Sequence, residues 1–218
     1  MHMTWYGHSC FRLRSRNGAV VTDPYGDELG YTLPRLRADI VTVSHDHPDH
    51  ASVKAIRGTP RIIDGPGEYE IKGIFVIGIP SYYEDSPEQS GVRNTVFLFD
   101  LDGVTVCHLG DLHRVPTQSQ IEELGDVDVL LIPVGGGSTL DPAKAAEVIS
   151  LLEPKVVVPM HYRTSLQKGL NLQSVGQFLQ EMGLKDVAPI DRVTITKSGL
   201  PSETQVIVMD CAVEGSAS

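Results

Sequence analysis

Residues 45–50 place four potential metal ligands within six positions of the chain. These candidates are His45, His47, Asp49 and His50. Imidazole and carboxylate ligands together suit Zn, Mn or Fe, whereas Ca prefers oxygen ligands alone. A solvated polar loop is the alternative interpretation, but three histidines and two aspartates in six residues are too dense for it. The segment therefore predicts a metal site.

Two distant residues are candidates to complete this site, because one short segment cannot surround an ion by itself. Asp111 follows a strand-like run at 104–107, and Gly110 before it permits a tight turn. His161 follows a similar run at 156–158. Taken alone, Asp111 would be a turn residue and His161 a core histidine. They become candidate ligands because the first cluster needs partners.

Three further features have two interpretations each. Asp23 is either a turn residue before Pro24 or an acceptor that orients a ligand histidine through its second ring nitrogen. His8 either lines the cavity or is structural. Residues 135–138, Gly-Gly-Gly-Ser, either cradle an oxyanion or phosphate with backbone N–H groups or form a turn before the next helix.

Short β-branched runs that end in polar, Gly or Pro residues predict the strands that position these side chains. Several should be buried on both faces. The runs are 19–22, 40–44, 61–63, 74–79, 95–99, 104–107, 127–132 and 156–158. Residues 192–195 and 205–209 are expected to form a closing strand pair. His45, Asp111 and His161 each come just after such a run, so they can converge on one rim.

Helical patterns lie between the strand-like runs, at 49–56, 117–124, 141–152 and 172–182. The third is the clearest, with Asp141 at the N-cap and Pro142 at the first helical position. Many strands, few helices and the lack of a linker or repeat predict one α/β or α+β sandwich domain. This domain is expected to cover 1–213, with 214–218 as a frayed tail.

The bulk composition limits the classes of function. A chain of 218 residues with 41% hydrophobic residues can bury a core without a metal, so a metal is expected to serve chemistry. The net charge of −10, with no basic patch to offset it, disfavours nucleic acid as the partner. No run of 18 apolar residues predicts a membrane span, and no signal peptide is visible at the start.

Three scattered cysteines carry no CxxC pair; they are Cys10, Cys107 and Cys211. Each has an apolar residue directly on one side, which predicts buried free thiols in a reducing compartment. The expected location is the cytoplasm.

Residues 45–50 match the H-x-H-x-D-H motif, and the chain thereby resembles the metallo-β-lactamase superfamily. The similarity extends to 5–11, 22–24, 65–69, 110–111, 133–137 and 159–162. Within the superfamily, the chain is similar to the small branch of lactonases of the ascorbate-6-phosphate type. The resemblance implies a four-layer αββα sandwich with one or two zinc ions at one edge, Mn or Fe being alternatives. It implies one site at His45 and His47, a second at Asp49, His50 and His161, with Asp111 bridging. Asp49 and Asp111 are the expected catalytic carboxylates.

The chain departs from this branch at one position. The branch usually offers a further histidine after the strand that corresponds to 74–79, and Tyr83 aligns with it here. A phenol is a poor ligand unless a metal lowers its pKa from about 10. Glu84 or Asp85 can serve instead, and otherwise the first site is one ligand short.

The resemblance implies a hydrolase that uses a metal-activated water on a small ester, lactone or phosphorylated compound. A small-molecule substrate is the expected partner, and a homo-oligomer is compatible with it. A nuclease or phosphodiesterase of the same superfamily is an alternative that the acidic charge disfavours. A non-catalytic descendant that binds metal or ligand is a third, because of the missing histidine.

Overall fold

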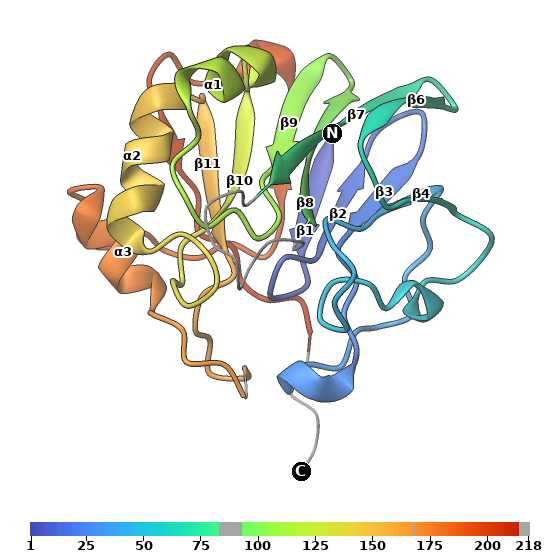
Figure 1. The fold of residues 1–218 in the computed structure, drawn as a ribbon, viewed down its shortest axis with the longest axis horizontal. Helices are drawn as coiled ribbons and strands as arrows, with labels where there is room; N and C mark the ends of the chain where they lie inside the picture. The colour runs from blue at the N-terminus through green and yellow to red at the C-terminus, as the bar shows by residue number, and fades with distance from the viewer. Residues whose placement is uncertain (83–92, 168, 214–218) are drawn as a thin grey trace.

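The computed structural model describes residues 1–82, 93–167 and 169–213. Two β-sheets pack face to face, and α-helices lie on the outer side of one of them (Figure 1). This mixed α/β sandwich is the fold class predicted from the sequence. Two sets of predicted features lie outside the described residues: the alternative ligands at 83–85, and the tail at 214–218.

Both sheets carry strands from distant parts of the chain. The first has the order β12-β1-β2-β3-β4-β5. Its strands are β1 His2–Trp5, β2 Phe11–Arg14, β3 Ala19–Thr22, β4 Ile40–Thr42, β5 Arg61–Ile63 and β12 Val193–Thr194. The second has the order β13-β11-β10-β9-β8-β7-β6. Its strands are β6 Gly67–Ile71, β7 Ile74–Tyr82, β8 Arg93–Leu101, β9 Val104–His108, β10 Val129–Pro133, β11 Val156–Met160 and β13 Gln205–Val206.

The helices cover the outer face of the second sheet, where β9, β10 and β11 run parallel (Figure 1). They are α1 Gln118–Leu124, α2 Pro142–Leu152 and α3 Val175–Glu181. Every residue of β10 and β11 is buried, because helices cover one face and the first sheet covers the other. The α2 helix begins as predicted, since the Asp141 side chain accepts a hydrogen bond from the Lys144 N–H.

The outer layer over the first sheet consists, in the described part of the chain, of loops and two 3-10 turns, η1 Asp27–Leu29 and η2 Val53–Ala55. A separate apolar cluster fills the space beneath it, where Val21 and Val41 pack against Tyr25 and Tyr31. This layer completes the fourth level of the sandwich.

The predicted helix at 49–56 is wrong, because only η2 forms there. The Ser52 N–H donates to the Pro24 carbonyl at 2.7 Å, and this contact takes the backbone out of a helical path. The predicted helix at 172–182 also begins later, at Val175, because the Gln173 N–H donates to the Gly135 carbonyl at 2.8 Å.

The predicted closing strand pair is wrong as well. Residues 193–194 pair with β1 at the edge of the first sheet, with His2 opposite Thr194. Residues 205–206 pair with β11 at the edge of the second sheet. Each segment instead closes one edge of a different sheet.

The three cysteines are free thiols. Cys10 and Cys107 are buried as predicted, while Cys211 is half-buried, and burial raises its pKa to about 12. Among the described residues, no helix has the length and apolar character needed to cross a membrane.

Candidate metal centre

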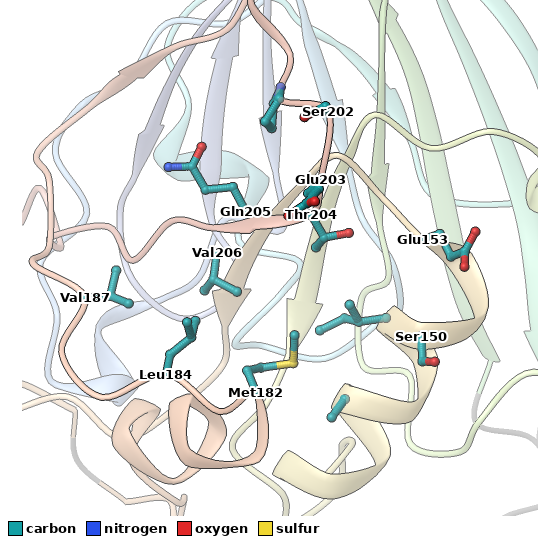
Figure 2. Close-up of a pocket in the computed structure, with 13 residues that line it drawn as sticks. Ser150, Glu153, Met182, Leu184, Val187, Ser202, Glu203, Thr204, Gln205 and Val206 are labelled. Carbon is teal, nitrogen blue, oxygen red and sulfur yellow. The ribbon is translucent and has the colours of Figure 1, made fainter.

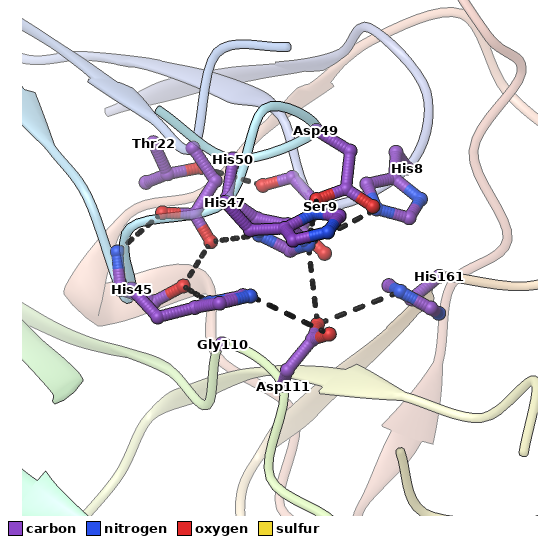
Figure 3. A network of polar contacts seen from close by, with 12 residues as sticks. His8, Ser9, Thr22, His45, His47, Asp49, His50, Gly110, Asp111 and His161 are labelled. Carbon is purple, nitrogen blue, oxygen red and sulfur yellow. Dashed lines mark hydrogen bonds and ion pairs between the residues drawn. The ribbon is translucent and has the colours of Figure 1, made fainter. Parts of the chain in front are cut away.

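Side chains from both sheets meet at one rim of the sandwich, beyond the carboxyl ends of parallel strands. His45 follows β4, Asp111 follows β9 and His161 follows β11 (Figure 3). Three non-glycine residues near this rim have left-handed backbone angles, His8 at φ 50°, Asp23 at φ 37° and His161 at φ 51°. Such conformations cost energy and gather at functional sites, where the surrounding structure holds them in place.

Asp111 faces three imidazoles (Figure 3). Its Oδ1 lies 3.3 Å from His50 Nε2 and 3.5 Å from His161 Nε2, and its Oδ2 lies 3.9 Å from His45 Nε2. Direct N–H···O hydrogen bonds usually measure about 2.7–3.2 Å. Two ligand atoms on one tetrahedral zinc ion, each about 2.0–2.1 Å from it, lie about 3.4 Å apart. The spacing around Asp111 therefore fits ligand atoms that share an ion.

Asp49 lies against two histidines of the H-x-H-x-D-H motif, His47 and His50. Its Oδ1 contacts His47 Nδ1 and lies 3.7 Å from His50 Nε2. The ligand atoms of His45, His47 and Asp49 all lie within 4.8 Å of one another, as do those of His45, His50 and Asp111. The structure thus brings together all six residues predicted as ligands. The His47 side chain is 61% exposed and that of His50 is fully buried, so the His47 side of the cluster opens to solvent.

His8 lies within the cluster rather than beside it. Its Nε2 is 3.0 Å from His50 Nε2 and 3.5 Å from Asp49 Oδ2, and its ring centroid is 4.0 Å from that of His161. Its Nδ1 is buried and has no hydrogen-bond partner among the described residues. A purely structural core histidine would satisfy both ring nitrogens. His8 therefore belongs to the ligand cluster itself, but it is buried and does not line the adjoining pocket, so the cavity-lining interpretation does not hold.

A buried carboxylate behind the cluster fixes two of the imidazoles. Asp23 Oδ2 accepts hydrogen bonds from His50 Nδ1 at 2.8 Å and from Ser44 Oγ at 2.6 Å. Since the Ser44 hydroxyl donates to Asp23, it accepts from His45 Nδ1 at 3.0 Å. Both rings then carry their proton on Nδ1 and turn Nε2 toward Asp111. This is the orienting role considered for Asp23 from the sequence.

Burial keeps most of these imidazoles in the neutral, ligating form. It lowers the pKa of His8 to about 3, with help from the neighbouring His161, and it also lowers the pKa of His45 and His161. His50 differs: burial lowers its pKa, but Asp111 and then Asp23 raise it to about 9 overall. Burial raises the pKa of Asp111, but His161 and other nearby imidazoles lower it by more than burial raises it. The pKa is therefore below its ordinary value, and the carboxylate stays ionised.

Two buried polar residues that the sequence did not single out position Asp111. Asn94 Oδ1 accepts from the Asp111 N–H at 2.9 Å, and its Nδ2 donates to the Leu109 carbonyl at 3.0 Å. His108 Nδ1 accepts from the Gly110 N–H at 3.2 Å. Both residues stand directly beside an apolar strand-like run in the sequence, Asn94 before 95–99 and His108 after 104–107. This is the sequence signal that could have identified them. A Cβ at Gly110 would lie 2.6 Å from Ser44 Cβ, so only glycine fits there.

The cluster forms one wall of a pocket of about 600 Å³. Gly137, Ser138, Leu170, Leu172 and His113 also line this pocket. Of the glycine-rich loop, the Gly136 N–H is already used by the Leu140 carbonyl. A Cβ at Gly135 would lie 2.1 Å from the His161 carbonyl, so this glycine permits close packing behind a predicted ligand. The loop therefore has a packing role as well as a place in the pocket wall.

A second concave surface of about 680 Å³ lies between α2, α3 and β13 (Figure 2). Its titratable lining residues are Glu153 and Glu203, and no histidine or cysteine lines it among the described residues. It therefore offers no alternative set of imidazole ligands.

Comparisons with known proteins agree with this architecture. Residues 2–161 match the family described as a β-lactamase superfamily domain. A UPF0173 metal-dependent hydrolase of Thermococcus kodakarensis is 30% identical over 72% of this chain and 83% of its own length. A solved Thermotoga maritima protein of the metallo-β-lactamase superfamily is 38% identical, with a TM-score of 0.79, over 95% of this chain and 97% of that one. A metallo hydrolase of Ignicoccus hospitalis, at 23% identity and a TM-score of 0.65, shares the fold over 89% of this chain and 99% of its own.

Proposed function

This chain belongs to the β-lactamase superfamily, and from that premise we propose that it is a zinc-dependent hydrolase of a small ester, lactone or phosphorylated compound. The observation that carries the proposal is the meeting of one carboxylate, Asp111, with three imidazoles at 3.3–3.9 Å. Zinc is supported by the nitrogen-rich ligand set, and the similar Thermotoga maritima protein is described as a candidate zinc-dependent hydrolase.

The ligand atoms divide between two adjoining positions. Asp49, His50 and His161 are the ligands proposed for one ion, with His8 close enough to join them. His45 and His47 are proposed for the other, and Asp111, which faces histidines of both sets, would contribute to both. Zinc ions held by these residues would supply Lewis acidity and would lower the pKa of a bound water to near neutrality.

The chain's own groups supply orientation and a limited space for the substrate. Asp23 holds His50, and Asn94 holds the backbone of Asp111, so the ligand cluster is preorganised. The pocket volume of about 600 Å³ suits a small molecule. His113 is proposed to contact the substrate, because it lines the pocket and burial, with Arg114 nearby, lowers its pKa to about 4.

The test is a panel of chromogenic esters, lactones, phosphomonoesters and phosphodiesters, assayed on protein with a measured zinc content. We expect one of the small-substrate classes to be hydrolysed, with activity lost on chelation and restored by zinc. Cleavage of RNA or phosphodiesters alone would favour the nuclease alternative. Inactivity toward every class at full zinc occupancy would favour a non-catalytic metal-binding protein.

The proposal also includes a cytoplasmic location, which the buried free thiols support.

Removal of the metal should leave the protein folded. The main apolar cluster lies between the sheets and under the helices, and it contains none of the proposed ligands. If free metal is present at 100 to 1,000 times its Kd, its removal should lower the melting temperature by roughly 5–15 °C in a chain of this size. Calorimetry with and without chelator measures this shift. Complete unfolding on chelation would instead mean that the metal has a structural role.

A further inference from the structure

A groove of about 750 Å³ at the far end of the first sheet is lined by six arginines. They are Arg12, Arg14, Arg16, Arg37, Arg57 and Arg61. Lys72 also lines this arginine groove, and Asp39 is its one acidic residue among the described ones. The sequence predicted no basic patch, and this prediction is wrong. The arginines are spread over fifty residues of sequence and come together only in the fold.

The arginine groove is separate from the candidate metal centre. It lies at the amino ends of β3, β4 and β5, whereas Asp23 and His45 follow the carboxyl ends of β3 and β4. A strand of four residues spans about 13 Å, so roughly this distance separates the two. The two cavities share no lining residue.

The groove concentrates positive charge in an acidic protein. A small hollow of about 230 Å³ adjoins it, shares Arg12 and Arg14, and adds Arg192. Among the described residues, the two surfaces together take eight cationic side chains and one acidic one, Asp39. Like charges held together repel one another, and a concave surface of one sign concentrates the counter-ion. The groove is therefore a place where an anion would be stabilised.

Most of these cations form no ion pair among the described residues. Lys72 pairs with Asp39 at 2.5 Å, and Arg16 pairs with Asp102 at 3.2 Å. Five of the arginines form no ion pair within the part of the chain that the structure describes; they are Arg12, Arg14, Arg37, Arg57 and Arg61. These five guanidinium groups are therefore available to an external anion.

The backbone that carries these arginines is held in place. The Arg57 N–H donates to the Leu36 carbonyl at 2.7 Å, and the Arg61 N–H donates to the Asp39 carbonyl at 2.8 Å. Arg12 Nε donates to the Arg37 carbonyl at 3.2 Å, which fixes one guanidinium across the groove. The backbone of the groove and the Arg12 guanidinium are thus preorganised, and preorganisation lowers the entropic cost of binding.

We propose that the arginine groove binds a compact anion with consecutive phosphates, of the class of inorganic triphosphate or a nucleoside triphosphate. Guanidinium groups present N–H donors in a planar fork that matches phosphate oxygens, and lysine does not. Five unpaired arginines suit an anion with three or four charges, and the volume suits a small ligand. A long nucleic acid is disfavoured, because the chain carries 28 acidic residues against 18 basic ones. Among the described residues only Asp39 of the acidic ones lines the two basic surfaces, so acidic groups elsewhere would repel a strand that extends beyond them.

The test is titration calorimetry with inorganic triphosphate and, separately, with adenosine triphosphate, at physiological ionic strength. The protein should be stripped of metal and dialysed free of chelator, because polyphosphates bind metal ions and a chelator is itself a competing polyanion. Arg37→Ala/Arg57→Ala is expected to weaken triphosphate binding by at least about tenfold per arginine. Arg35→Ala is the matched control, since Arg35 is exposed nearby but does not line the groove. The two titrations distinguish an inorganic ligand from a nucleotide.

The replaced arginine side chains are exposed, so the melting temperature should stay unchanged and the variants should remain folded. His161→Ala should bind triphosphate as the unmodified protein does, because this site is independent of the metal centre. Unchanged affinity in Arg37→Ala/Arg57→Ala would overturn the proposal. So would triphosphate binding no tighter than orthophosphate, which would indicate only a diffuse ion atmosphere. Tighter binding of a 20-nucleotide RNA than of either triphosphate would overturn it in favour of a nucleic-acid surface.

Discussion

His161→Ala and Asp49→Ala are each expected to leave the purified protein with little bound metal and with hydrolytic activity lowered by at least about a hundredfold. Replacing a group that only orients a ligand typically costs about 10–100-fold in metal affinity or activity. Loss of a ligand itself should therefore cost more. His161 Nε2 lies 3.5 Å from Asp111 Oδ1, and Asp49 Oδ1 lies 3.7 Å from His50 Nε2, so both replacements open the same cluster. Elemental analysis under identical zinc buffering measures the loss.

Asp46→Ala is the matched control for Asp49→Ala. Asp46 lies in the same motif but is exposed and belongs to none of the groups of potential ligands found among the described residues. It should keep full metal content and activity. His2→Ala plays the same part for His161→Ala, because His2 is exposed on β1 and its ring contacts Thr194. Undiminished zinc in both Asp49→Ala and His161→Ala would contradict the proposal that these two residues bind the same ion.

The sequence allowed the candidate centre to be predicted because its ligands follow recognisable strand-like runs. The apolar run before His45 and the run before Asp111 both form strands, and β4 and β9 deliver these two residues to one rim. The dense motif at 45–50 also carried the superfamily resemblance, which the match over residues 2–161 confirms. The lactonase-like branch stays a prediction, as do the substrate class and zinc.

Features that depend on tertiary contacts could not be predicted in this way. Residues 193–194 and 205–206 are equally strand-like, and their different partners are decided by which sheet edge each one reaches. The arginine groove is invisible in a count of charges, because its members are separated in sequence and the net charge is negative. Asn94 and His108 act through backbone groups of the turn before Asp111, and a sequence motif records side chains rather than such contacts.

Asp23→Asn is expected to lower metal affinity by about 10–100-fold while leaving the fold intact. The Asp23 carboxylate accepts directly from His50 Nδ1 and reaches His45 through the Ser44 hydroxyl, so it sets the ring orientation of two proposed ligands. Burial raises the pKa of Asp23, but His108 and then the contact with His50 hold it well below its usual range, so the group is charged. Asparagine keeps the size and tolerates the left-handed backbone angle at this position, but its amide cannot accept all these hydrogen bonds.

Asp23→Ala should be worse for stability, by about 3–5 kcal/mol, because it leaves His50 Nδ1 and both Ser44 donors buried without an acceptor. Competition with a chromophoric chelator measures zinc affinity, and calorimetry measures stability in the same samples. Thr42→Val is the matched control: Thr42 is buried beside Asp23, and its hydroxyl has no hydrogen-bond partner among the described residues, so neither quantity should change much. A purely structural Asp23 would reduce stability in the Asn variant and leave zinc affinity unchanged. A joint loss of affinity and activity in Asp23→Asn, at a nearly unaltered melting temperature, is the result that an orienting carboxylate requires.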